Sequence, residues 1–265
     1  MEQKKPEVEV EFAGLVAVVT GAAQGIGRAI AEELHRRGAT LVLVDRNAAG
    51  LVATVQDLKA PGLAAVHAAV ADLADPAAIT ALAAQVSALA PHVDILVNNA
   101  GIEYDLPLAE VTAALFDRVI AVNLRAPFLL SQALVPLFPA AGGAIVNISS
   151  IHATHAFLNA IPNACSKAGM MALTRNLALE LAPRRIRVNA VCPGYIDTAL
   201  WDEWVRSSPD PEALAAQTQA LHPLGRRGLP ADVASAVAFL ASRGAAWVTG
   251  THLVVDGGLT IRAHP

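Results

Sequence analysis

Cysteine, charged residues and long apolar segments are all scarce in this chain of 265 residues. Its two cysteines, Cys165 and Cys192, are too few to cross-link a chain of this length, and neither has metal-ligand spacing. No segment offers about 18 uninterrupted apolar residues, and the first twelve residues, MEQKKPEVEVEF, lack the apolar run of a secretory signal. The sequence therefore predicts a cytoplasmic protein with free thiols, no metal and no membrane partner.

Charged residues make up 16% of the chain, and the net charge is -4. The one basic cluster consists of Arg184, Arg185 and Arg187. So small a basic surface argues against nucleic acid or an anionic membrane as the main partner. Apolar residues, at 54%, are numerous enough to fill a large core.

Short β-branched segments alternate with Ala- and Leu-rich segments along the chain. Strands are expected at 15–20, 40–45, 63–72, 94–99, 143–150, 185–193 and 251–258, and the main helices at 26–37, 76–90, 112–138, 162–181 and 230–241. Strands that are apolar on both faces and separated by helices predict a parallel sheet covered on both sides. The predicted fold class is α/β, a single doubly wound Rossmann domain over residues 13–265 with about seven parallel strands. A flexible N-terminal extension, residues 1–12, is expected to precede it.

Residues 195–229 form a long insertion between the last strand but one and the last helix. Segments beyond the carboxyl ends of parallel strands commonly cover a ligand, so this insertion is expected to be a lid over the substrate. A simple surface excursion is the alternative.

The segment TGAAQGIGRA, residues 20–29, follows a predicted strand and opens a predicted helix. Gly21, Gly25 and Gly27 would let the backbone approach a pyrophosphate, which the free amides at a helix N-terminus attract. Asp45 ends the next strand, where its carboxylate can bind the ribose hydroxyls of adenosine and repel a 2′-phosphate. NAD is therefore favoured over NADP, although Arg46 could hold such a phosphate instead.

Several further motifs occur in a fixed order: NNAG (98–101), VNL (122–124), NISS (147–150), SKAG (166–169), IRVNAVCPGYIDT (186–198) and VTGTHLVVDGG (248–258). Together with the glycine-rich turn they resemble the short-chain dehydrogenase/reductase family over roughly residues 15–259. The resemblance implies a small alcohol or carbonyl compound as substrate and a homo-oligomer, commonly a tetramer, as the assembly.

The resemblance also implies a set of cofactor-binding residues. These are Gly21, Gln24, Gly25, Ile26 and Gly27 around the pyrophosphate, Asp45 and Arg46 at the adenosine ribose, Asp72 and Leu73 at the adenine, Asn99, Ala100 and Gly101 along the cleft, Lys167 at the nicotinamide ribose, and Pro193, Gly194, Ile196 and Thr198 beside the nicotinamide.

The catalytic tetrad of the family is incomplete in this chain. Asn123, Ser150 and Lys167 match three of its members, but Asn163 occupies the position of the tyrosine, four residues before the lysine. The spacing from Ser150 is that of the family, and the two tyrosines of the chain, Tyr104 and Tyr195, are far from this helix in sequence. The tyrosine is therefore absent rather than displaced.

Asparagine has no ionisation near working pH, so it cannot supply the proton that accompanies hydride transfer. General acid–base catalysis contributes roughly 10² to 10⁴ in rate, so full activity by the family's mechanism is not expected. His152, two positions after Ser150, is a candidate replacement because an imidazole titrates near pH 6.5. A water molecule is another candidate, and a loop histidine without a chemical role is the alternative for His152.

Three functions remain open. The first is an NAD-dependent oxidoreductase whose proton relay is rebuilt or impaired. The second is a catalytically inactive dinucleotide-binding protein, and the third is a non-redox lyase or isomerase that uses the same pocket. A hydroxylated or sugar-like substrate is suggested by the polar and aromatic residues expected at the pocket, Glu103, Tyr104, His152, His155 and Trp201.

Overall fold

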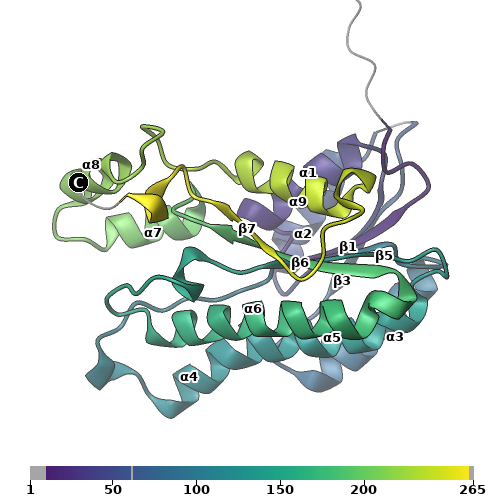
Figure 1. Ribbon diagram of the computed structural model, residues 1–265, viewed down its shortest axis with the longest axis horizontal. Coiled ribbons are helices and arrows are strands. Elements are labelled where there is room, and N and C mark those ends of the chain that lie inside the picture. Colours follow the sequence, from purple (N-terminus) through teal and green to yellow (C-terminus); the bar gives the residue numbers. More distant parts are fainter. Residues whose placement is uncertain (1–9, 61, 263–265) are drawn as a thin grey trace, which may run out of the picture.

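The computed structural model describes residues 10–60 and 62–262, in which seven parallel strands form one sheet (Figure 1). The strands lie in the order β3-β2-β1-β4-β5-β6-β7. Their bounds are β1 (Val16–Thr20), β2 (Thr40–Asp45), β3 (Val66–Val70), β4 (Ile95–Asn98), β5 (Gly143–Ile148), β6 (Ile186–Pro193) and β7 (His252–Val255). The predicted fold class, a single doubly wound domain with about seven parallel strands, is confirmed.

Helices cover both faces of the sheet (Figure 1). One face carries α1 (Gly25–Arg36), α2 (Ala48–Leu58) and α9 (Pro230–Ala241), and the other carries α3 (Pro76–Leu89), α4 (Ala113–Ile120), α5 (Ala126–Leu134) and α6 (Ile161–Leu181). In β1, Ala17 and Val19 pack toward α1 and α9, whereas Val16 and Val18 pack toward α3 and α5. Because strand side chains alternate between faces, a strand that is apolar throughout contributes to both cores.

The domain begins earlier than the sequence predicted. Residues 1–9 of the expected flexible extension lie outside the described residues. Phe12, however, is only 1% exposed, and its backbone N–H donates to the carbonyl of Arg37 over 2.9 Å. Burial of a phenylalanine is worth about 1.5–3 kcal/mol, so the chain before residue 13 already contributes to the core.

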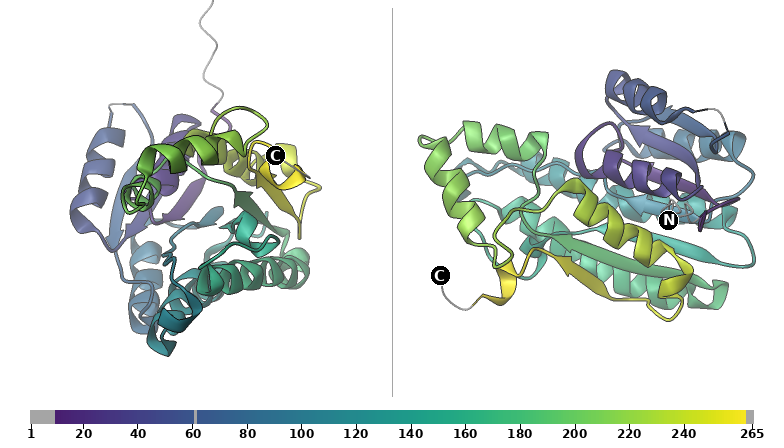
Figure 2. Two further views of the ribbon diagram at one scale, coloured as in Figure 1. Left: turned by 90° about the vertical axis from the view of Figure 1, so that its left-hand side faces the viewer. Right: turned by 90° about the horizontal axis from the view of Figure 1, so that it is seen from above.

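The insertion at 195–229 contains two short helices, α7 (Ala199–Arg206) and α8 (Pro211–Ala220). The side chains of Thr198 and Asp210 cap their N-termini by accepting hydrogen bonds from backbone amides. A bridge between Ile196 and Gly228 closes the base of the insertion. Figure 2 shows both helices together at one end of the molecule, and the chain enters this region directly from the carboxyl end of β6.

The predicted helix at 112–138 is interrupted. A π-helical turn, Ala121–Arg125, joins α4 to α5, and a 3-10 turn follows α5. Among the described residues, this run, Ala113–Leu137, has the length and apolar composition to cross a membrane, but half of its apolar window is buried inside the fold. Core helices of globular domains have the same properties, so the composition of this helix is explained by its packing.

Candidate active site

The turn between β1 and α1 is a cradle built from backbone. Gly21 and Gly25 have φ angles of 68° and 56°, a conformation that glycine adopts at little cost. A Cβ atom added at Gly27 would collide with the carbonyl oxygen of Gly21. Gln24, at the N-cap of α1, makes no side-chain capping bond, so the first amides of the helix remain available to a ligand. This arrangement fits a pyrophosphate group.

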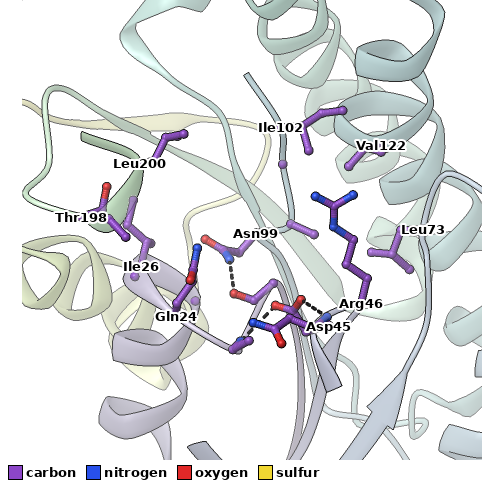
Figure 3. Close-up of a pocket in the computed structure, with 18 of the residues that line it drawn as sticks. Gln24, Ile26, Asp45, Arg46, Leu73, Asn99, Ile102, Val122, Thr198 and Leu200 are labelled. Carbon is purple, nitrogen blue, oxygen red and sulfur yellow. Dashed lines mark hydrogen bonds between the residues drawn. The ribbon is translucent and has the colours of Figure 1, made fainter. Parts of the chain in front are cut away.

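The cradle opens into a cavity of about 390 Å³, within the range of small-molecule sites (Figure 3). The predicted cofactor residues that line it are Gly21, Gln24, Gly25, Ile26, Gly27, Asp45, Arg46, Asp72, Leu73, Asn99, Ala100, Gly101 and Thr198. The other four predicted cofactor residues, Lys167, Pro193, Gly194 and Ile196, are not part of its wall. Residues that line it without having been predicted include Ile102, Arg118, Val122, Ala199 and Leu200.

Asp45 stands at the wall of this cavity, with Arg46 beside it (Figure 3). One carboxylate oxygen accepts a hydrogen bond from the Ala23 N–H at 3.0 Å, and the other accepts from the Asn47 N–H at 2.9 Å. These bonds fix the carboxylate but leave lone pairs for further donors. A negative and a positive side chain therefore border the same part of the cavity.

Arg118, on α4, is a pocket residue that the sequence did not identify. Its guanidinium donates to the Asp72 carboxylate over 2.9 Å. The hydrogen bond from the Ala74 N–H, followed by the hydrogen bond from the Arg118 guanidinium, lowers the pKa of Asp72. Asp72 is therefore a fixed anion at the rim, and no motif around Arg118 signals this pairing.

Lys167 lies on α6, one helical turn after Asn163, and both side chains are buried. The Lys167 ammonium donates to the carbonyl oxygen of Ile148, at the end of β5, over 2.9 Å. Burial lowers the pKa of Lys167, while the nearby Glu103 and Cys192 act in the opposite direction. The Lys167 side chain is thus held one helical turn from Asn163, beside the end of β5.

Asn123 occupies the π-helical turn between α4 and α5. Its Oδ1 accepts from the Ile102 N–H and its Nδ2 donates to the Ile102 carbonyl, each at 2.9 Å, and Nδ2 also contacts Ser166 Oγ at 3.2 Å. Such turns widen a helix locally and are frequent at functional sites. Here the widened turn lets one side chain clamp the loop that follows β4.

Ser150 caps a short 3-10 turn, Ile151–Ala153, because its Oγ accepts a hydrogen bond from the His152 N–H at 3.2 Å. Ser150 therefore has a structural role at this turn. It uses a lone pair of the hydroxyl and leaves the O–H free to donate to a ligand, so it does not preclude a catalytic role.

Asn163 joins two side chains that the sequence could not place together. Its Nδ2 donates to Glu103 Oε1 at 2.5 Å and to His152 Nδ1 at 2.9 Å. His152 Nδ1 is itself 3.5 Å from Glu103 Oε1. The three residues come from α6, from the loop after β4 and from the turn after β5.

The two ionisable members of this group have displaced pKa values of opposite sign. Burial, with help from Asp105, raises the pKa of Glu103 to about 7, and Lys167 and the Asn163 hydrogen bond oppose the rise. Burial, followed by the charge of Lys167, lowers the pKa of His152 to about 4. His152 is therefore neutral at pH 7. This pKa is lower than the value near 6.5 that made His152 a candidate for the missing proton donor.

Phe157 connects this group with the aromatic rings of the insertion, because its ring centroid lies 4.3 Å from that of His152 and 6.3 Å from that of Tyr195. Tyr195 is stacked against Trp204 with a centroid distance of 6.0 Å and meets Trp201 edge-on at 5.5 Å. Of the residues expected at the substrate pocket, Glu103 and His152 thus lie together and Trp201 lies close by. His155 is exposed and bonds to Thr154, and Tyr104 is 43% exposed. Across residues 10–60 and 62–262, no cluster of three or more His, Cys, Asp or Glu side chains is arranged to hold a metal ion.

The chain is similar to known proteins over nearly all of its length. A family model described as "Enoyl-(Acyl carrier protein) reductase" matches residues 21–260. D-threitol dehydrogenase of Mycolicibacterium smegmatis is 39% identical, over 97% of this chain and 98% of the relative. Galactitol 2-dehydrogenase (L-tagatose-forming) of Cereibacter sphaeroides is 42% identical, over 94% of this chain and 96% of the relative.

A solved structure from Beutenbergia cavernae, provisionally described as an NAD(P)-dependent gluconate 5-dehydrogenase, has NADP bound at low occupancy. It is 38% identical and superposes with a TM-score of 0.87, covering 96% of this chain and all of the other. The relatives are named as dehydrogenases, and the family model is named for a reductase. The chain belongs to the short-chain dehydrogenase/reductase family.

Proposed function

We propose that the protein is an NAD-dependent oxidoreductase that interconverts a polyhydroxylated alcohol and its carbonyl form, with a proton relay altered at Asn163. The observation that supports this most directly is that the cavity bordered by the glycine cradle extends toward the catalytic candidate Lys167. The glycine cradle and Asp45 border one cavity, and Gly101, at its inner wall, would bring an added Cβ within 3.7 Å of the Lys167 ammonium. A dinucleotide on the cradle would therefore extend toward the buried lysine.

Each catalytic candidate has a role that this geometry allows. Bound nicotinamide supplies or accepts the hydride. Lys167 would hold the nicotinamide ribose, and the free O–H of Ser150 would orient the substrate oxygen. Asn123 keeps the loop after β4 in place through its two bonds to Ile102. Asn163 can orient neighbours through its amide but does not exchange a proton.

The substrate class follows from the side chains that face the reaction centre. Glu103, Asn163 and His152 offer a carboxylate, an amide and an imidazole within hydrogen-bonding distance of one another. A chain of hydroxyl groups can bind several such donors and acceptors, while the ring of Tyr195 covers its apolar side. The relatives named for D-threitol and galactitol support a sugar alcohol as the substrate.

The preference for NAD over NADP rests on Asp45. Its carboxylate lies at the cavity wall, held by the backbone N–H groups of Ala23 and Asn47. A 2′-phosphate placed there would meet this negative charge. Arg46 borders the same cavity and would favour the phosphate. The relative affinities for NADH and NADPH therefore measure which of the two side chains dominates.

The purified protein tests the proposal directly. Calorimetric titration with NADH and NADPH measures cofactor binding, and the absorbance of reduced nicotinamide follows oxidation of a panel that includes D-threitol and galactitol. We expect NADH to bind more tightly than NADPH and at least one sugar alcohol to be oxidised. The variant Gly27→Ala, which places a methyl group against the Gly21 carbonyl, is the control and is expected to bind neither nucleotide.

The outcomes separate the alternatives. No binding at ~1 mM nucleotide, on the order of the weakest affinities considered, would overturn the proposal. Binding without turnover, together with turnover in Asn163→Tyr, would identify a dinucleotide-binding protein that has lost its chemistry. Conversion of a substrate without any change in nicotinamide absorbance would identify a lyase or isomerase. Tighter binding of NADPH would reverse the cofactor assignment.

We further propose that the protein is cytoplasmic and that it forms a homotetramer, the assembly that the family resemblance implies. The edge strand β7 supports an assembly because its apolar side chains Leu253 and Val254 are 37% and 40% exposed. On the neighbouring helix α9, Phe239 is 46% exposed. Exposed apolar side chains gathered at a sheet edge are commonly covered by another chain.

A further inference from the structure

We infer that Glu103 takes the place of the absent tyrosine as the group that exchanges a proton with the substrate oxygen. The inference rests on the proposed oxidoreductase function and names the residue that rebuilds its relay. Glu103 lies outside the Asn123, Ser150 and Lys167 positions that match the family's tetrad. It comes from the loop after β4, two positions after Gly101.

Geometry places the Glu103 carboxylate next to the tyrosine position. Its Oε1 lies 2.5 Å from Asn163 Nδ2, the end of the side chain that replaces the phenol. A tyrosine side chain is longer than an asparagine side chain by roughly one hydrogen-bond length. The carboxylate oxygen therefore lies within roughly the reach of a phenol oxygen at position 163.

Side chains from three other parts of the chain surround Glu103. Lys167 and Asn163 face it from α6, His152 from the turn after β5, and Tyr195 from the segment after β6. Asp105, on the same loop, adds a like charge. With burial as the main cause and Lys167 opposing, the pKa of Glu103 is raised to about 7. A carboxyl group poised near neutrality is suited to both giving and taking a proton.

The Glu103 side chain can also exchange its proton with solvent. Glu103 is 30% exposed, whereas the His152 side chain is 13% exposed. Water can therefore exchange protons with Glu103 between turnovers. The Nδ1 of His152 accepts a hydrogen bond from the Asn163 amide and carries no proton itself, so His152 is a positioning residue for Asn163 and Glu103.

In the proposed reaction, Glu103 acts as the base during alcohol oxidation. In alcohol oxidation the carbinol C–H bond breaks and its hydride, with both electrons, passes to NAD⁺. The substrate O–H bond breaks, its electrons form the second bond of the carbonyl, and its proton passes to the Glu103 carboxylate. The products are the carbonyl compound, NADH and a protonated Glu103, which then releases the proton to water. Carbonyl reduction runs through the same bonds in reverse.

The first test compares Glu103→Gln with Glu110→Gln, an exposed glutamate on the same connection between β4 and α4. With a sugar alcohol that the wild-type protein oxidises, Glu103→Gln is expected to lower kcat roughly 10² to 10⁴-fold, the usual contribution of general acid–base catalysis. It should also abolish the dependence of kcat on a group titrating near pH 7. Glu110→Gln should change neither quantity. In the Asn163→Tyr background, where a phenol is restored, Glu103→Gln should cost much less.

The second test needs neither cofactor nor substrate. Infrared titration of the nucleotide-free protein should show the carbonyl band of one protonated carboxyl that disappears with a midpoint near pH 7 and is missing in Glu103→Gln. Thermal unfolding establishes that the variant is folded. Turnover in Glu103→Gln that equals the wild-type value, or a wild-type infrared titration without such a band, would overturn the inference. Either result leaves the proposed function intact, because that function fails only when the wild-type protein binds no nucleotide or moves no hydride.

Discussion

At the scale of single residues, Glu103 and His152 titrate in opposite senses while sharing the Asn163 amide. The folded pKa of Glu103, about 7, lies above its ordinary 4.5, so the stability it contributes is complete below pH 4.5 and is lost as the pH rises to 7. The folded pKa of His152, about 4, lies below its ordinary 6.5. Its contribution is complete above pH 6.5 and is lost as the pH falls to 4.

These two contributions should nearly cancel between pH 4.5 and 6.5, and single substitutions should separate them. In Glu103→Gln the free energy of unfolding, relative to the wild-type protein, should rise with pH across this window. In His152→Gln it should fall. Each slope has an upper limit of about 1.4 kcal/mol per pH unit. Urea unfolding followed by circular dichroism at three pH values measures both slopes, and parallel curves for all three proteins would contradict the shifts.

The sequence predicted some residues of the site better than others. Motifs led to the glycine cradle, Asp45 and Lys167, and the spacing within α6 led to Asn163 at the position expected for a tyrosine, because each belongs to a strand end or helix turn with fixed geometry. Glu103 was expected only to line a pocket, since it lies in a loop with no periodicity to orient it. The depressed pKa of His152 depends on burial by distant segments, which spacing within the chain does not report.

At the scale of elements, the insertion at 195–229 is tied down by Arg227. Its Nε donates to Asp197 at 2.5 Å, its guanidinium lies 4.8 Å from the centre of the Trp201 ring, and NH1 reaches the Ala215 carbonyl at 3.3 Å. One side chain thus connects the start of the insertion with both α7 and α8. The adjacent Arg226 instead forms an exposed pair with Asp232.

Arg227→Ala should therefore loosen the insertion, while Arg226→Ala should not. Loss of hydrogen bonds to charged groups costs about 1.5–3 kcal/mol, so a roughly tenfold or greater rise in KM for the sugar alcohol is expected, with a smaller change in kcat. Limited proteolysis should cut the Arg227→Ala protein faster between residues 195 and 229. Equal KM values and equal cleavage rates for the two variants would show that Arg227 does not hold the insertion over the substrate.

Element boundaries were largely predictable, and the interruptions were not. Pro230–Ala241 forms a helix as predicted, since a proline opens it and an apolar face runs along it. The helix expected at 112–138 contains the π-helical turn at Asn123, which no residue type in that segment signals. In the insertion no helix was predicted, although Thr198 and Asp210 cap the N-termini of two short ones.

At the scale of the whole molecule, the parallel sheet has two edge strands with different surroundings. β7 presents Leu253 and Val254 at its surface, and β3 lies at the opposite edge, near the exposed Leu63. Light scattering should give the mass of four chains for the wild-type protein. Leu253→Glu should reduce that mass, because a charge would be buried in the interface, whereas Leu63→Glu should leave it unchanged. A monomeric wild-type protein would exclude the proposed tetramer.

The paired hydrogen bonds between Asn123 and the backbone of Ile102 have a consequence for how this site can diverge. They anchor the peptide immediately before Glu103 from a helix that does not include position 163. A substitution at 163 removes the bond between Asn163 and Glu103 but leaves these two bonds in place. Under the proposed function, nucleotide binding and proton exchange can therefore change independently during evolution.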